Sequence, residues 1–322
     1  MGFDAPPMIE SDYIFTIAPF QECHASTLIE VENGEILAAW FGGTKEGSND
    51  VGIWLSRRGE EGWSAPEEVV REEGVPCWNP VLFRGPDGRI WLFYKVGVNP
   101  RSWSGALVKS SDGGVTWTAP EILPAGLLGP IKNKPILMSN GEVLHPTSVE
   151  SYRAWTCWAE IMKPDGSAWQ RHGPIAFPGN NFGLIQPSVV ETSPGKVRAF
   201  MRSTRSIGSI CAAESEDYGR TWTKAWRTPL PNPNSGIDAV GLESGAIAMV
   251  YNHTRDARHP INVALSRDGG DTWGEPGVLD HEPGEYSYPA VIQTTDGLIH
   301  TTYTHRRKTI KHCVFPEEWL TG

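Results

Sequence analysis

The chain has 322 residues and a formal net charge of −10 at pH 7. This acidic balance argues against nucleic acid or a membrane surface as a partner, and no run of eighteen apolar residues indicates a membrane-spanning helix. The N-terminal segment lacks the basic start and apolar core of a secretory signal, and the five cysteines form no paired motif, so we expect free thiols and a cytoplasmic location.

A two-part repeat recurs along the chain at intervals of 50 to 54 residues. Each copy has a turn dipeptide that ends in glycine, and a tryptophan follows the first five glycines after 27 to 29 residues. The glycines are Gly34, Gly88, Gly141, Gly195, Gly245 and Gly297, and the tryptophans are Trp63, Trp117, Trp169, Trp222 and Trp273. A period of this length is typical of a β-propeller with four strands per blade. The sequence therefore predicts an all-β, six-bladed β-propeller that forms a single domain over residues 1–322.

Each repeat is predicted to form four short strands. In the fifth repeat, for example, residues 237–242, 246–251 and 261–266 are rich in β-branched and apolar residues and are bounded by turn residues. The sixth repeat is incomplete at the C-terminus. We therefore expect residues 13–17 from the N-terminus to supply its fourth strand, because an N-terminal strand that closes the last blade removes exposed sheet edges.

The turn before the repeat tryptophan carries a second pattern, S-x-D-x-G-x-T-W. Complete copies occupy residues 110–117, 215–222 and 266–273. In such a turn the aspartate accepts hydrogen bonds, the glycine adopts a positive φ, and the tryptophan anchors the turn on the blade. We interpret these turns as structural elements at the end of the propeller opposite its mouth. The mouth is the end where first strands begin and second strands end.

These turns resemble the Asp boxes of the sialidase (neuraminidase) superfamily, over the whole chain. The resemblance implies a site at the mouth, with Asp50 as acid/base, Tyr286 as nucleophile and Tyr288 as its alternative. It also implies that Arg202 and Arg258 bind a substrate carboxylate. The sequence departs from the family pattern at His24, where an arginine is expected, and at Gln186, where a glutamate is expected.

Other polar and aromatic residues are expected at the same mouth. His24 could act as a general acid or base because its unperturbed pKa is about 6.5, and Glu150 could replace the missing glutamate from the neighbouring blade. Further candidates for substrate binding, together with Gln186 and Tyr288, are Lys45, Lys134, Trp40, Asp238 and Arg306. Basic side chains at a constricted mouth can attract an anionic ligand despite the acidic whole.

Three functions are compatible with this pattern. The leading hypothesis is a sialidase-like exo-glycoside hydrolase that acts on sialic acid or a related acidic terminal sugar of oligosaccharides. The alternatives are a lyase on uronate-containing glycans, with His24 and Tyr286 as proton-transfer groups, and a non-catalytic glycan-binding propeller. No metal-ligand spacing stands out, and no cofactor is expected. The density of polar groups at the mouth favours an enzyme.

Overall fold

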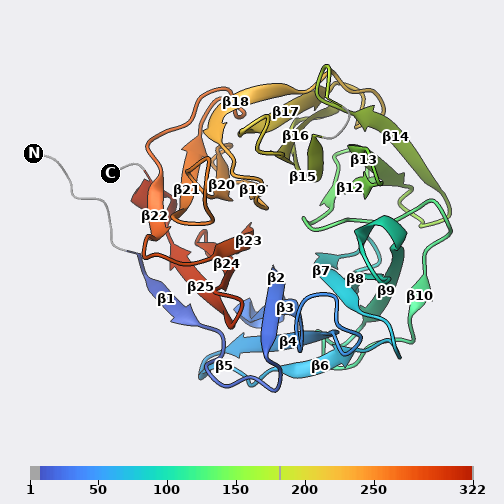
Figure 1. Cartoon of the computed structure of the whole chain (residues 1–322), viewed down its shortest axis with the longest axis vertical. Helices are drawn as coiled ribbons and strands as arrows, with labels where there is room; N and C mark the ends of the chain where they lie inside the picture. The colour runs from blue at the N-terminus through green and yellow to red at the C-terminus, as the bar shows by residue number, and fades with distance from the viewer. Residues whose placement is uncertain (1–7, 181–182, 321–322) are drawn as a thin grey trace, which may run out of the picture.

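The computed structural model describes residues 8–180 and 183–320; most of the N-terminal segment considered above for a targeting signal lies outside them. Six antiparallel sheets stand side by side in a ring around a central axis (Figure 1). The prediction of an all-β six-bladed propeller is confirmed. The only helices in the described residues are 3-10 turns, of three or four residues each, and none is long enough to cross a bilayer.

The first three blades follow the chain from the inner strand outward. Blade 1 contains β2 (Glu22–Glu30), β3 (Ile36–Gly43), β4 (Gly52–Gly59), β5 (Gly62–Trp63) and β6 (Glu67–Val70). Blade 2 contains β7 (Cys77–Arg84), β8 (Ile90–Val96), β9 (Ser104–Ser110) and β10 (Glu121–Ile122). Blade 3 contains β11 (Ile136–Leu137), β12 (Val143–Glu150), β13 (Trp155–Met162) and β14 (Trp169–Ile175). The 3-10 turn η1 (Glu32–Gly34) joins β2 to β3, and η2 (Pro100–Ser102) joins β8 to β9.

The remaining blades repeat the plan and close the ring. Blade 4 contains β15 (Leu184–Ser193), β16 (Lys196–Ser203), β17 (Ser209–Ser215) and β18 (Trp226–Pro231). Blade 5 contains β19 (Asp238–Gly241), β20 (Ile247–Tyr251), β21 (Ile261–Ser266) and β22 (Gly277–Asp280). Blade 6 contains β23 (Tyr286–Gln293), β24 (Ile299–His305), β25 (Thr309–Phe315) and the N-terminal β1 (Glu10–Tyr13), and η3 (Glu317–Leu320) follows β25.

The closing strand lies slightly earlier in the chain than predicted. β1 pairs with β25 in the register Glu10 opposite Val314 to Tyr13 opposite Lys311, so the predicted range 13–17 overlaps it only at Tyr13. Ile14 N still donates to the Ile310 carbonyl at 2.9 Å, and the side chains of Ile14 and Phe15 pack into the core beside blade 1. The Phe15 ring stacks on Trp40 with centroids 4.9 Å apart.

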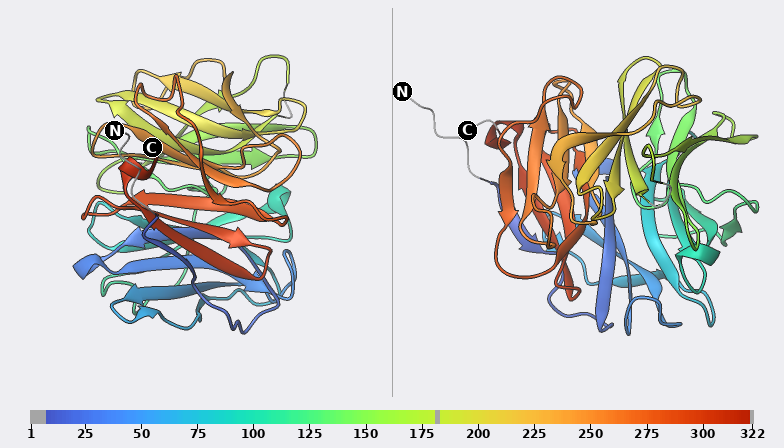
Figure 2. Two further views of the ribbon diagram at one scale, coloured as in Figure 1. Left: turned by 90° about the vertical axis from the view of Figure 1, so that its left-hand side faces the viewer. Right: turned by 45° about the horizontal axis from the view of Figure 1, so that its top comes forward.

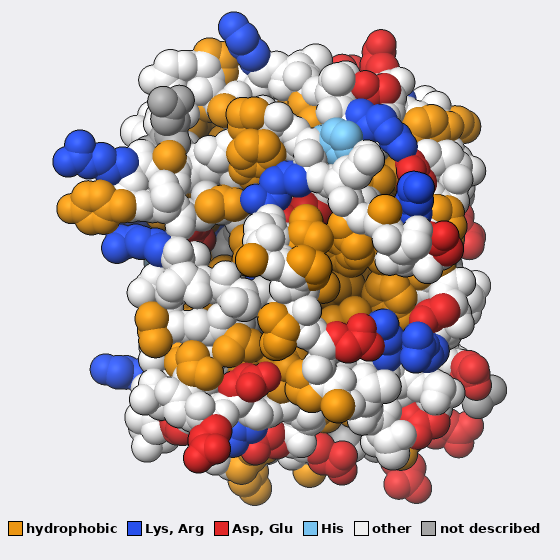
Figure 3. Space-filling model, turned by 90° about the vertical axis from the view of Figure 1, so that its right-hand side faces the viewer, with side chains coloured by type: hydrophobic (Ala, Val, Ile, Leu, Met, Phe, Trp, Pro, Cys, Tyr) orange, Lys and Arg blue, Asp and Glu red, His pale blue; other side chains and the backbone are white. Residues whose placement is uncertain are grey.

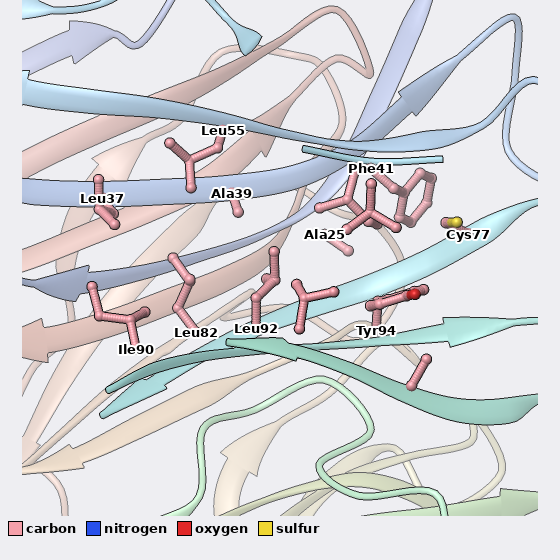
Figure 4. Packing of buried hydrophobic residues seen from close by; sticks show 14 of the residues in the cluster. Ala25, Leu37, Ala39, Phe41, Leu55, Cys77, Leu82, Ile90, Leu92 and Tyr94 are labelled. Atoms are coloured by element: carbon pink, nitrogen blue, oxygen red, sulfur yellow. The ribbon is translucent and has the colours of Figure 1, made fainter. Parts of the chain in front are cut away.

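Apolar side chains fill the spaces between neighbouring blades. One cluster joins blades 1 and 2 and includes Leu37, Leu55, Leu82 and Leu92 (Figure 4). Another joins blades 5 and 6. Each blade therefore buries its faces against its two neighbours, so that a complete ring leaves no blade face uncovered.

The three complete Asp boxes form the turns that their sequence predicts. In the blade 4 copy, the Asp217 carboxylate accepts hydrogen bonds from Ser215 Oγ at 2.7 Å and from Thr221 N at 2.8 Å. Gly219 has a φ of +83°, and a Cβ there would lie 2.5 Å from Leu144 of blade 3. This turn therefore fixes the close approach of blades 3 and 4.

Seen from the side, the strands cross the thickness of the ring (Figure 2). The loops consequently gather on two opposite faces. The loops that lead into the first strands share one face, the mouth, with the loops that join second to third strands.

Candidate active site

A cavity of about 220 Å³ lies at the mouth. All six blades contribute to its lining, which consists of Glu46, Trp78, Asn79, Pro100, Trp103, Glu150, Trp155, Ile185, Gln186, Arg202, Arg258, Tyr288 and Arg307. Cavities that bury drug-sized ligands measure about 300–1,000 Å³. This smaller cavity suits a single sugar ring.

β-Bulges in the inner strands aim side chains at this cavity. The pairing registers of β7, β15 and β23 break between Trp78 and Val81, between Ile185 and Ser188, and between Ser287 and Ala290. The residue at the break has a positive φ: 40° at Asn79, 53° at Gln186 and 53° at Tyr288. Non-glycine residues adopt such a φ rarely, and bulges re-aim side chains next to functional sites. Three cavity residues from blades 2, 4 and 6 are placed in this way.

Tyr288 is held by two hydrogen-bond donors at the centre of the cavity. Its hydroxyl oxygen accepts from Gln186 Nε2 at 3.0 Å and from Arg202 Nη1 at 2.9 Å. Arg202 Nη1 also donates to Gln186 Oε1 at 3.0 Å, which orients the amide. Both donors would stabilise negative charge on the phenol oxygen.

Three arginines face the same cavity. Arg202 and Arg258 lie over the Tyr288 ring, 5.7 and 5.9 Å from its centroid. Arg307 donates through Nε to Glu285 Oε1 at 2.9 Å, and Arg258 donates to the same oxygen at 2.8 Å. Burial raises the pKa of Glu285, but the two guanidinium groups outweigh it and lower the pKa overall. Three guanidinium groups are thus gathered at the mouth although the chain carries a net negative charge.

Two carboxylates, Glu150 and Glu46, also line the cavity. Burial raises the pKa of Glu150, and the Glu46 carboxylate adds to this, whereas the charges of Arg202 and Arg101 oppose it. Glu46 pairs with Arg307 Nη1 at 2.5 Å. Within the described residues Glu150 has no ion-pair or hydrogen-bond partner, so it can hold a proton and face a ligand.

His24 packs against Tyr288 with its imidazole in the neutral form. Its ring centroid lies 4.1 Å from that of Tyr288, and its Nδ1 lies 3.0 Å from Thr304 Oγ1. Burial, and then the charges of Arg307 and Arg258, lower the pKa of His24 well below its usual range. Its Nε2 is buried without a partner in the described part of the chain.

The structure places Tyr288, and not Tyr286, in the lining of the cavity. Tyr286 is fully buried, packs against Tyr303 and His305 between blades 5 and 6, and is absent from the cavity lining. A sequence signal does identify Tyr288: it lies nine residues before its turn glycine and precedes a proline, as Gln186 and Asn79 do in their blades.

Several other predicted residues also lie outside the lining. Trp40 is buried in the core against Phe15, because its strand position faces the neighbouring blade. Lys45 and Arg306 are exposed. The Asp50 carboxylate caps its own loop, accepting from Thr44 N at 2.9 Å and Thr44 Oγ1 at 2.8 Å.

Lys134 and Asp238 form an ion pair with each other. The distance from Lys134 Nζ to Asp238 Oδ2 is 2.7 Å, and Asp238 is 2% exposed. The pair joins blades 3 and 5. Its position therefore points to a structural role rather than to direct ligand contact.

Comparison with known proteins shows the family to which this chain belongs. The model of the BNR repeat-like domain matches residues 34–301. The chain belongs to the BNR repeat-like domain family. The predicted resemblance to sialidases is confirmed at the level of fold and family.

Relatives of this BNR repeat-like protein include sialidases. A sialidase of Bacteroides fragilis (strain YCH46) is 26% identical over 227 residues, which cover 65% of this chain and 40% of that protein, so the chain matches less than half of its relative. Among solved structures, a protein of unknown function from Dyadobacter fermentans has a TM-score of 0.80 at 18% identity and covers 96% of this chain and 98% of its own. A Hadza microbial sialidase has a TM-score of 0.78 at 20% identity, with coverage of 92% and 66%.

Sequence reasoning missed part of the lining of this BNR repeat-like domain. Glu46, Trp103 and Trp155 come from loops after second strands or from the strand that follows, and Arg307 directly follows the predicted residue Arg306. These loops differ in length from blade to blade, so no periodic signal marks them. Within the described residues no cluster of three or more His, Cys, Asp or Glu side chains could hold a metal ion.

Proposed function

We propose that this protein is an exo-acting glycoside hydrolase that removes an acidic sugar from the end of an oligosaccharide. One observation carries the proposal: three guanidinium groups, the Tyr288 phenol and a carboxyl with a raised pKa share one cavity. Planar guanidinium groups bind carboxylates through paired hydrogen bonds. The cavity size restricts the ligand to one terminal ring.

In this mechanism Arg202, Arg258 and Arg307 bind the sugar carboxylate. Glu150, whose pKa is raised by burial, donates its proton to the glycosidic oxygen as the bond to the leaving group breaks. Tyr288 attacks the anomeric carbon through its phenol oxygen, and the phenol proton passes to a solvent water. Water then cleaves the sugar from Tyr288, with the Glu150 carboxylate as general base, and the phenolate regains its proton from solvent.

Gln186 stands where a carboxylate would otherwise activate the tyrosine. Its amide cannot accept the phenol proton, but it donates to the phenol oxygen and holds it in place. The neutral imidazole of His24 packs on the Tyr288 ring, so it adds no positive charge beside the phenol.

The test is a panel of aryl glycosides and oligosaccharides ending in sialic acid, glucuronate, galacturonate or a neutral sugar, with products followed by mass spectrometry. Products that together gain one water from an acidic substrate support the proposal. Tyr288→Phe and Glu150→Gln should each lower kcat/KM by about 10² or more. Tyr286→Phe and the exposed Glu61→Gln should leave it near the wild-type value. Absence of release from every acidic substrate would refute the hydrolase.

A lyase is the second candidate, and Gln186 favours it, because elimination needs no covalent tyrosine intermediate. The arginines would neutralise a uronate carboxylate, and His24 or Tyr288 would remove the proton on the adjacent carbon. Glu150 would protonate the departing oxygen as a carbon–carbon double bond forms. Products would then gain no water, and one of them would absorb in the near ultraviolet.

A further inference from the structure

An exposed aromatic side chain with two arginines stands beside the cavity. Tyr152 lies in the hairpin 151–154 between β12 and β13 and is 75% exposed. The guanidinium carbons of Arg101 and Arg153 lie 5.5 and 5.9 Å from the Tyr152 ring centroid. We call Tyr152, Arg101 and Arg153 the rim platform.

The rim platform adjoins the cavity through both of its supporting segments. Glu150 and Trp155 face each other at the ends of the hairpin that carries Tyr152, and both line the cavity. Arg101 lies in η2 between Pro100 and Trp103, which also line it. The charge of Arg101 acts on Glu150, the proposed proton donor. A sugar leaving from Glu150 would therefore pass over the platform.

The hairpin holds Tyr152 in a defined place. Ser151 N donates to the Ala154 carbonyl at 2.8 Å, and Ser151 Oγ bonds to the same residue. The Tyr152 side chain projects from this hairpin, and other described residues leave most of it uncovered. Figure 3 shows basic side chains along one edge of the molecule, with a projecting hydrophobic side chain between two of them.

The arginines of the rim platform are available for a ligand. In the part of the chain that the structure describes, neither Arg101 nor Arg153 forms an ion pair, whereas Arg258 and Arg307 inside the cavity are paired with Glu285. Exposed guanidinium groups bind carboxylate or sulfate, and an aromatic ring stacks on the apolar face of a sugar. The combination fits a sugar ring that itself carries an anionic group.

We propose that the rim platform is a second subsite, which binds the sugar next to the terminal one and requires a carboxylate or sulfate on it. The substrate class is then an oligosaccharide with acidic groups on successive sugars. This inference deepens the proposed function, because the first sugar occupies the cavity. A binding experiment tests the second subsite separately from the proposed hydrolase activity, because binding to the rim platform can be measured without turnover.

Binding is measured by titration calorimetry in a Glu150→Gln background, in which cleavage is expected to be slow. The ligands are the acidic monosaccharide selected by the activity panel, or glucuronate if none is cut, and tetrasaccharides with carboxylate, sulfate or no charge on the second ring. Arg101→Ala/Arg153→Ala should weaken binding of a charged tetrasaccharide by about tenfold or more, and monosaccharide binding should not change. Tyr152→Ala should weaken tetrasaccharide binding, and Tyr152→Phe should restore it.

The matched control is Lys224→Ala, which removes one exposed positive charge away from the mouth and should have no effect. Comparison of the carboxylated and sulfated ligands identifies the anion. The proposed anionic subsite would be overturned if Arg101→Ala/Arg153→Ala weakened binding of the uncharged tetrasaccharide as much as binding of the charged ones. It would also be overturned if the variant weakened monosaccharide binding equally, or if the affinity for every ligand stayed unchanged. Failure to detect any cleavage by the wild-type protein would refute only the hydrolase, because these affinity differences do not depend on it.

Discussion

Replacing Asp238 should strongly destabilise the propeller. The buried Asp238 carboxylate accepts hydrogen bonds from three other blades: from Lys134 Nζ at 2.7 Å, Ser188 Oγ at 2.8 Å and Val291 N at 2.9 Å. It also accepts from Ala239 N at 3.0 Å. One side chain therefore ties the inner strands of blades 3, 4, 5 and 6 together.

The size of the effect follows from the groups that Asp238→Ala leaves behind. Breaking a buried ion pair by removing one partner costs about 3–5 kcal/mol, and each buried donor left unpaired adds about 1 kcal/mol. The Lys134 side chain is 20% exposed, so water recovers part of this cost. We expect a loss of about 4 kcal/mol, a large share of the total stability of about 5–15 kcal/mol that is common for domains.

The assay is equilibrium urea unfolding followed by tryptophan fluorescence. At a slope of about 3 kcal/mol per molar urea, a loss of 4 kcal/mol lowers the midpoint by about 1.3 M. Asp271→Ala is the matched control, because Asp271 is 65% exposed in its ion pair with Arg198 and should cost less than about 1 kcal/mol. A midpoint for Asp238→Ala within the range of this control would show that the ion pair does not hold the inner strands.

Three other substitutions test the cavity and the acid stability of the fold. Glu150→Gln should remove the alkaline limb of the pH–rate profile, because the raised pKa of Glu150 means that activity falls as this acid loses its proton; a retained limb would assign it to another group. Gly236→Leu should displace the Tyr288 ring, which lies 3.4 Å from the position of an added Cβ, and weaken binding of the acidic sugar in calorimetry, whereas Gly236→Ala should not. Burial lowers the pKa of the His145 side chain to about 3 in the folded protein, whereas the same side chain has a pKa of about 6.5 in the unfolded chain. The unfolded chain therefore takes up the proton first, and the stability of the fold decreases as the pH drops below 6.5. His145→Phe should reduce the loss in urea-unfolding free energy between pH 7 and pH 5 by about 2 kcal/mol; an unchanged loss would contradict the buried neutral histidine.

The departures from the sialidase pattern were visible in the sequence, but their meaning was not. In the sequence, His24 and Gln186 are only two positions at which the residue expected from the family pattern is replaced by another. In the structure they are the neutral ring packed on Tyr288 and the amide bonded to its hydroxyl. Their chemistry can be judged only from these contacts, because pKa and hydrogen bonding depend on burial and on charges brought from other blades.

The sequence by itself determined the fold. Turn glycines such as Gly195 and Asp-box residues such as Asp217 act through local backbone geometry, so they repeat with each blade and can be counted along the chain. Only the tertiary structure decided the site. Arg307 and Glu46 come from loops without a shared period, and Tyr288 rather than Tyr286 reaches the cavity because a bulge turns its side chain. Closure of the ring brings these residues together, and distances between blades are not encoded in any local stretch of sequence.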